Sequence, residues 1–65
     1  MFSSENFPWQ IVKDITFLKK DRKVLIEFVS GRGLEAKPPN EEIWDQLIRD
    51  ATLNLNNDQI HYDNT

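Results

Sequence analysis

The chain has 65 residues, of which 38% are hydrophobic and 29% are charged, and its formal net charge is −3. It is long enough for one small domain, because a chain of about 60 residues buries only roughly 60% of its unfolded surface. It contains no cysteine and one histidine, which excludes disulfide bonds and thiolate metal sites and leaves few groups for catalysis.

The N-terminal segment, residues 1–10, is predicted to be an irregular arm that is rich in aromatic side chains. Pro8 argues against a helix there, because proline biases the residue before it towards extended backbone. Two interpretations of Phe7 and Trp9 stay open. Either they complete a very small core, or they form part of a surface that contacts another protein, since aromatic residues are enriched at interfaces.

Two β-strands are predicted next, over residues 11–18 and 23–29, because β-branched and aromatic residues recur at a period of two. One face of the first strand carries Ile11, Ile15 and Phe17. One face of the second strand carries Val24, Ile26 and Phe28, and its other face carries Leu25, Glu27 and Val29.

Two turns and a short third strand complete an antiparallel meander. The polar residues 19–22 form the first turn, and residues 30–33 form the second turn, which holds both glycines of the chain. Glycine suits a turn because it adopts positive φ without steric cost. Residues 34–37 continue as the third strand.

A helix is predicted after Pro38 and Pro39, with Asn40 as its N-cap. Glu41 and Glu42 occupy the first turn, where the positive end of the helix dipole favours acidic side chains. An apolar stripe at helical spacing consists of Ile43, Trp44, Leu47, Ile48, Ala51 and Leu55. The helix is expected to end near residues 53–55.

The predicted fold is therefore α+β, a three-stranded antiparallel meander packed against one C-terminal helix, over residues 11–55. Residues 56–65 form a polar C-terminal tail, which is either frayed or adds a short strand through Ile60 and Tyr62.

Catalytic and cofactor sites are not expected. No serine lies in a Gly-x-Ser-x-Gly elbow, and His61 lies in the polar tail. Glu41 and Glu42 are adjacent, so on a helix they diverge and chelate a metal poorly. The prediction is a protein that is not an enzyme and has no catalytic residue, cofactor or metal.

The function predicted from these features is a small accessory module that binds another protein as an adaptor, a regulator or an inhibitor. The second face of the sheet would carry hydrophobic side chains among polar ones: Val12, Leu18, Leu25 and Val29. A single helix leaves that face uncovered, so a protein partner or a second copy of the chain would cover it. The predicted contact residues are Phe7, Trp9, Leu25 and Val29, with Glu41, Asp45 and Arg49 at a polar rim.

The alternative function is a nucleic-acid-associated module. It would use the basic residues of the two turns, namely Lys19, Lys20, Arg22, Lys23 and Arg32. Residues 1–37 carry seven basic and five acidic side chains, whereas residues 38–65 carry one basic and six acidic side chains. The sequence pI of about 4.9 argues against this alternative, because nucleic-acid-binding domains are usually basic.

A cytoplasmic location is expected. The first residues lack the basic and then apolar layout of a signal peptide. The absence of cysteine fits a reducing compartment. No apolar run approaches the roughly 20 residues that a membrane span needs.

Overall fold

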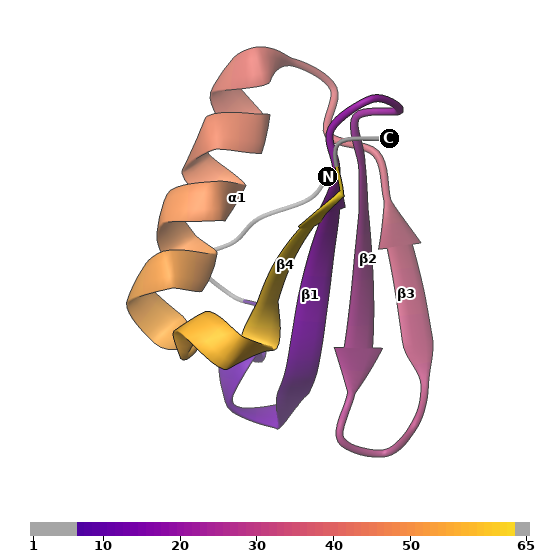
Figure 1. The fold of residues 1–65 in the computed structure, drawn as a ribbon, viewed down its shortest axis with the longest axis vertical. Coiled ribbons are helices and arrows are strands. Elements are labelled where there is room, and N and C mark those ends of the chain that lie inside the picture. The colour runs from indigo at the N-terminus through magenta and orange to yellow at the C-terminus, as the bar shows by residue number, and fades with distance from the viewer. Residues whose placement is uncertain (1–6, 64–65) are drawn as a thin grey trace.

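The computed structural model describes residues 7–63, which form a four-stranded sheet with an α-helix packed on one of its faces (Figure 1). In chain order, the elements are a 3₁₀ turn η2 (Trp9–Ile11), β1 (Val12–Leu18), β2 (Lys23–Phe28), β3 (Gly33–Ala36), α1 (Glu41–Asn54), a 3₁₀ turn η3 (Asn57–Gln59) and β4 (Ile60–Asp63). The ends of the strands and the helix agree with the sequence patterns to within a few residues.

The sheet has the strand order β3-β2-β1-β4, in which β4 runs parallel to β1 and the other pairs are antiparallel. The α+β class, the β1-β2-β3 meander and the helix that follows it are therefore confirmed. The prediction of three antiparallel strands is wrong in strand number and order, because the sheet is mixed and has a fourth strand. Helix α1 carries the chain from the β3 edge across the sheet to the β1 edge, and this long connection allows a parallel pair (Figure 1).

Strand β4 comes from the segment predicted as a polar tail. Its alternate residues are apolar, so that Ile60 lies beside Ile15 and Tyr62 lies beside Phe17 in the parallel register. Of the two outcomes considered for this segment, the structure shows the short extra strand.

A β-bulge near the start of β1 reverses the predicted facing of its first residues. Val12 is opposite Phe28 and Asp14 is opposite Glu27, so β1 has one more residue than β2 over this stretch. The extra residue shifts the alternation. Val12, predicted on the second face, is therefore buried with 3% exposure, whereas Ile11, predicted beside Ile15, is 46% exposed.

The side chain of Gln59 connects η3 to this bulge. Its Nε2 donates to the carbonyl oxygens of Lys13 at 3.0 Å and Val12 at 3.4 Å. Its Oε1 accepts from the backbone N–H of Asn56 at 2.8 Å, which completes a capping box at the start of η3. One amide thus links the bulge in β1 to the turn that precedes β4.

Helix α1 begins as its capping signal predicts. The Oδ1 atom of Asn40 accepts from the backbone N–H of Ile43 at 2.9 Å, and two glutamates occupy the first turn. The helix buries Trp44, Leu47 and Ala51 against the sheet, in agreement with the apolar stripe.

The core lies between α1 and the facing side of the sheet. Its buried hydrophobic residues are Trp9, Val12, Ile15, Phe17, Val24, Ile26, Trp44, Leu47 and Ala51. The indole of Trp9 is 8% exposed, and the ring of Phe7 lies 4.8 Å from it and 6.1 Å from the ring of Phe28. Phe7 and Trp9 therefore both pack against the core, as the first of the two interpretations has it. Residues 1–6 of the predicted arm lie outside the described residues.

Candidate functional site

The face of the sheet opposite α1 is the candidate site. Within residues 7–63, no helix packs on this face, which we call the open face (Figure 1). Side chains alternate along each strand, so the neighbours of the buried residues Val24 and Ile26 point away from the helix. In the register of β1, β2 and β3, Leu25 lies between Thr16 and Glu35.

A shallow hollow of about 440 Å³ lies on the open face. Its lining comes from β1, β2, β3 and the turn before β3: Asp14, Thr16, Leu25, Ile26, Glu27, Gly31, Gly33, Leu34 and Glu35. Leu25 is in the middle strand of the three and is 39% exposed, so its side chain forms an apolar centre among polar neighbours.

The two glycines that line the hollow differ in backbone conformation, and only one of the two conformations requires glycine. Gly31 has φ +91°, a conformation that L side chains rarely adopt, so its turn requires glycine. Gly33 has no positive φ, and a Cβ added there would meet only the carbonyl oxygen of Ile26, at 3.9 Å. That separation is an ordinary contact, so the backbone would accept a side chain at Gly33.

The hollow has an acidic lining. Among the described residues, those that line it include Asp14, Glu27 and Glu35 and no lysine or arginine. Two lysines approach from the rim: Lys13 Nζ lies 4.0 Å from Glu27 Oε2, and Lys23 Nζ lies 3.4 Å from Glu35 Oε1. Both pairs are substantially exposed, and exposed ion pairs of this kind contribute little to stability.

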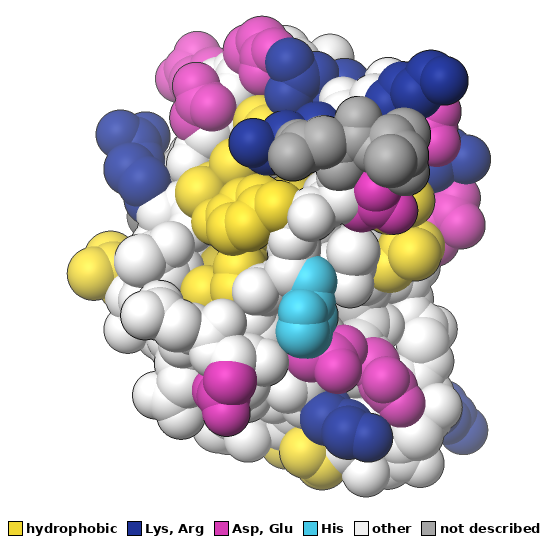
Figure 2. All heavy atoms as spheres, viewed as in Figure 1, with side chains coloured by type: hydrophobic (Ala, Val, Ile, Leu, Met, Phe, Trp, Pro, Cys, Tyr) yellow, Lys and Arg dark blue, Asp and Glu magenta, His cyan; other side chains and the backbone are white. Residues whose placement is uncertain are grey.

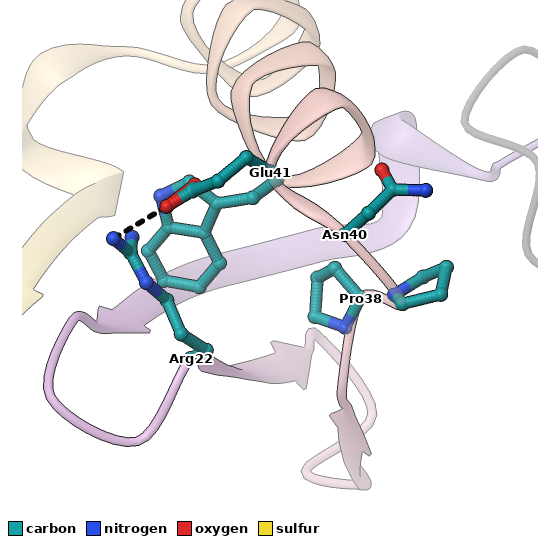
Figure 3. Close-up of a pocket in the computed structure, with 6 residues that line it drawn as sticks. Arg22, Pro38, Asn40 and Glu41 are labelled. Carbon is teal, nitrogen blue, oxygen red and sulfur yellow. Dashed lines mark ion pairs between the residues drawn. The ribbon is translucent and has the colours of Figure 1, made fainter.

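A second, smaller pocket lies where the β1–β2 turn meets the start of α1 (Figure 3). It has a volume of about 210 Å³ and is lined by Arg22, Pro38, Pro39, Asn40, Glu41 and Trp44. The guanidinium of Arg22 points towards Glu41, with 2.6 Å between Nη2 and Oε1, and its Cζ lies 5.0 Å from the centroid of the Trp44 ring. Arg22 thus lies over the indole and forms one wall of the pocket.

The backbone of Arg22 is strained. Its φ of +53° is in the left-handed region, where a residue with a Cβ is disfavoured. Arg22 is the last residue of the β1–β2 turn, and its side chain contacts Glu41 and Trp44.

The second pocket adjoins a row of aromatic rings. Phe17 lies 5.5 Å from Trp44 in an edge-to-face arrangement and 5.5 Å from Tyr62 in a stacked one. Lys19 Nζ lies 5.3 Å from the centroid of the Tyr62 ring. Figure 2 shows hydrophobic side chains gathered where α1 meets β4, with Lys and Arg side chains beside them at the upper end. The cation–π contacts of Lys19 with Tyr62 and of Arg22 with Trp44 hold these two side chains of the β1–β2 turn against the aromatic rings.

The structure separates the residues predicted to contact a partner. Leu25 is in the hollow, and Val29 is exposed just after β2. Phe7 and Trp9 pack on the core side. The predicted rim residues Glu41, Asp45 and Arg49 are exposed on α1, which lies on the opposite side of the sheet.

The structure also adds residues that the sequence analysis did not select, namely Asp14, Thr16, Glu27, Gly33 and Glu35. Period-two alternation already placed Glu27 beside Leu25. The contribution of β1 and β3 depends on the strand register.

The five basic residues of the alternative function lie at two ends of the sheet. Lys19, Lys20, Arg22 and Lys23 lie at or beside the β1–β2 turn, whereas Arg32 lies in the β2–β3 turn at the other end of β2. Three of the five contact other side chains: Arg22 contacts Glu41, Lys23 contacts Glu35, and Lys19 contacts Tyr62.

Residues 7–63 contain no group of three or more His, Cys, Asp or Glu side chains that could hold a metal ion. None of the helices in this range has the length and apolar character needed to cross a membrane.

Comparison of the chain with protein-family models, curated proteins and solved structures gave no match.

Proposed function

We propose that this protein is a small, non-catalytic module that binds another protein as an adaptor, a regulator or an inhibitor, and that the open face of its sheet is the contact surface. The observation that carries the proposal is the one-sided packing of the sheet. Helix α1 buries one face, and the other face presents Leu25 within a hollow of about 440 Å³.

The composition of this face supports a protein contact. Interfaces combine a buried apolar centre with a polar rim, and a few central residues contribute most of the binding free energy. On the open face, Leu25 supplies the apolar centre, and Thr16, Glu27 and Glu35 supply polar groups around it. The three strands hold these side chains in a fixed register.

A matched pair of variants tests the proposal. Leu25→Asp places a charge at the centre of the open face, and Leu53→Asp makes the same change on α1, where Leu53 is 82% exposed. Tagged wild-type protein and both variants are used to capture partners from the native lysate, with thermal unfolding measured for each. We expect a stoichiometric partner to be retained by wild type and Leu53→Asp and lost by folded Leu25→Asp.

Two results would contradict the proposal. Equal capture by Leu25→Asp and wild type would mean that the open face is not the contact surface. Loss of every partner after nuclease treatment would instead support the nucleic-acid alternative, whose binding should also weaken steeply with salt. The proposal is favoured over that alternative because the sequence pI is about 4.9 and the five basic residues are divided between two ends of the sheet.

A further inference from the structure

Strand β4 covers the edge of β1, where two of the best-buried side chains of the core lie. It pairs with β1 alone and forms one edge of the sheet (Figure 1). In the parallel register, Ile60 lies beside Ile15, and Tyr62 lies beside Phe17. Both of these β1 residues are 0% exposed. Strand β4 therefore closes the core on this side.

The segment that carries β4 contributes little buried surface of its own. None of residues 52–63 is fully buried, and Tyr62 is 47% exposed. A parallel pair of strands is also slightly less stable per residue than an antiparallel pair. Segments with few buried apolar contacts open locally at a lower free energy than the core does. Strand β4 thus has the properties of a unit that opens before the rest of the sheet.

Hydrogen bonds fasten β4 to β1 at both of its ends. Before the strand, Nε2 of Gln59 donates to the carbonyl oxygens of Lys13 at 3.0 Å and Val12 at 3.4 Å. At the far end, the backbone N–H of Lys19 donates to the carbonyl oxygen of Asp63 at 3.0 Å. Each such bond contributes modestly in net free energy, because water replaces it when the strand leaves.

Release of β4 would leave a strand-binding site at the edge of β1. The backbone of β1 would lose its partner, and Ile15 and Phe17 would be uncovered on one side. An extended segment that adds to such an edge gains main-chain hydrogen bonds, while its alternate side chains fill the positions along the edge. The structure shows a segment that fits, namely β4, with an isoleucine and an aromatic ring two residues apart.

We propose that β4 is a releasable strap, which opens while β1, β2, β3 and α1 stay folded, and that the uncovered edge of β1 binds an extended segment of a partner protein. This segment runs parallel to β1, with an apolar residue beside Ile15 and an aromatic residue beside Phe17. Ile60 and Tyr62 hold these two places in the closed state. The inference goes beyond the proposed function, because it uses an edge of the sheet and not the open face.

Hydrogen exchange of the full chain under native conditions tests whether the strap opens separately. The reporter is the backbone amide of Lys19, which lies outside β4 and whose acceptor is Asp63. We expect its protection, and that of the β4 amides, to be about a hundredfold lower than that of Val24 and Ile26 in the interior strand β2. Equal protection of Lys19 and Ile26 would mean that β4 leaves only on global unfolding, which overturns the inference.

A variant at one end of β4 tests whether the whole strap opens as one unit. Gln59→Ala removes the hydrogen bonds to β1 before the strand, and it should lower the protection of Lys19, at the other end, about tenfold. Asn57→Ala, at an exposed position of η3, is the matched control and should leave it unchanged. Unchanged protection of Lys19 in Gln59→Ala would show that the two ends open independently, and the strap would be disproved.

A defined peptide tests the binding site. The probe is an acetylated and amidated heptapeptide of residues 57–63, and in a matched peptide serine replaces the isoleucine and the tyrosine. We expect the first peptide to shift the amide resonances of Ile15, Phe17 and Lys19. It should bind Gln59→Ala about tenfold more tightly than wild type, because the apparent affinity rises with the open fraction. Equal binding of the two peptides, or shifts confined to the open face, would contradict the inference.

Two controls separate this site from other occupants and from the open face. Leu25→Asp, which disrupts the open face, should leave binding of the heptapeptide unchanged, so the proposed function and this inference fail separately. Sedimentation with and without the heptapeptide tests a second copy of the chain as the occupant. We expect the oligomeric state of the wild-type protein to stay the same. A dimer that the heptapeptide dissociates would show that two copies exchange β4, and a partner strand would be excluded.

Discussion

The two faces of the sheet are made from the same strands and have opposite properties. On the face under α1, Ile15, Phe17 and Val24 are fully buried. On the open face, their strand neighbours Thr16 and Leu25 remain accessible. The difference shows how a chain of this size divides its residues, because one helix can bury one face only. Stability should depend on the covered face, and binding should depend on the open one.

The largest expected effect comes from the covered face. Phe17→Ala removes a fully buried ring that contacts both Trp44 and Tyr62. We expect the free energy of unfolding to fall by about 3–5 kcal/mol, which approaches the whole stability of a small domain. Thr16→Ala, the adjacent change on the open face, serves as the control and should lower it by no more than about 1 kcal/mol, the cost of replacing a β-branched residue by alanine in a strand. Urea denaturation measures both, and similar losses would remove the distinction between the faces.

The next largest effect is expected at the β-bulge that places Val12 on the covered face. Gln59→Ala removes the hydrogen bonds from the amide to the carbonyl oxygens of Lys13 and Val12. We expect a loss of about 1–2 kcal/mol and faster hydrogen exchange in β4, because the bulge and the turn before β4 lose their link. Asn57→Ala, at an exposed position of the same turn, is the control. Unchanged exchange in β4 would show that the bulge stands without Gln59.

A smaller change in stability is expected from the β1–β2 turn, which contacts the start of α1. Arg22→Ala and Arg22→Gly both remove the contacts with Glu41 and Trp44, but only glycine relieves the φ of +53°. We therefore expect Arg22→Gly to be more stable than Arg22→Ala by about 1 kcal/mol. Thermal unfolding of the two variants gives the difference. Equal stabilities would mean that the turn relaxes once the arginine is removed.

The smallest expected change in stability lies on the open face itself. Gly33→Val should leave the free energy of unfolding unchanged or raise it by up to about 1 kcal/mol, because a β-branched residue replaces a strand glycine. Chemical denaturation of this variant measures the change. A clear loss of stability would show that the fold needs glycine at this position.

Local signals in the sequence were sufficient for the helix and for the central strands. Asn40 and the two glutamates after it mark the start of α1, and the apolar stripe through Trp44 and Leu47 marks its buried side. The alternation in β2 correctly separates Ile26 from Leu25. The candidate site was found in part, since Leu25 was selected, whereas Trp9 was considered both for a contact surface and for the core and is buried in the core.

The remaining features depend on residues far apart in the chain. Strand β4 forms because α1 returns the chain to the free edge of β1, where Ile60 pairs with Ile15. The bulge that buries Val12 forms against the partner strand, and Gln59, 47 residues away from Val12, donates hydrogen bonds to it.

The sequence by itself determined the helix and the three strands before it, because capping, alternation and turn preferences act over a few neighbouring residues. Only the tertiary structure decided which face stays open and which carboxylates surround Gly33. The physical reason is that strand register and the path of the helix are set by packing between distant segments, which no local pattern contains.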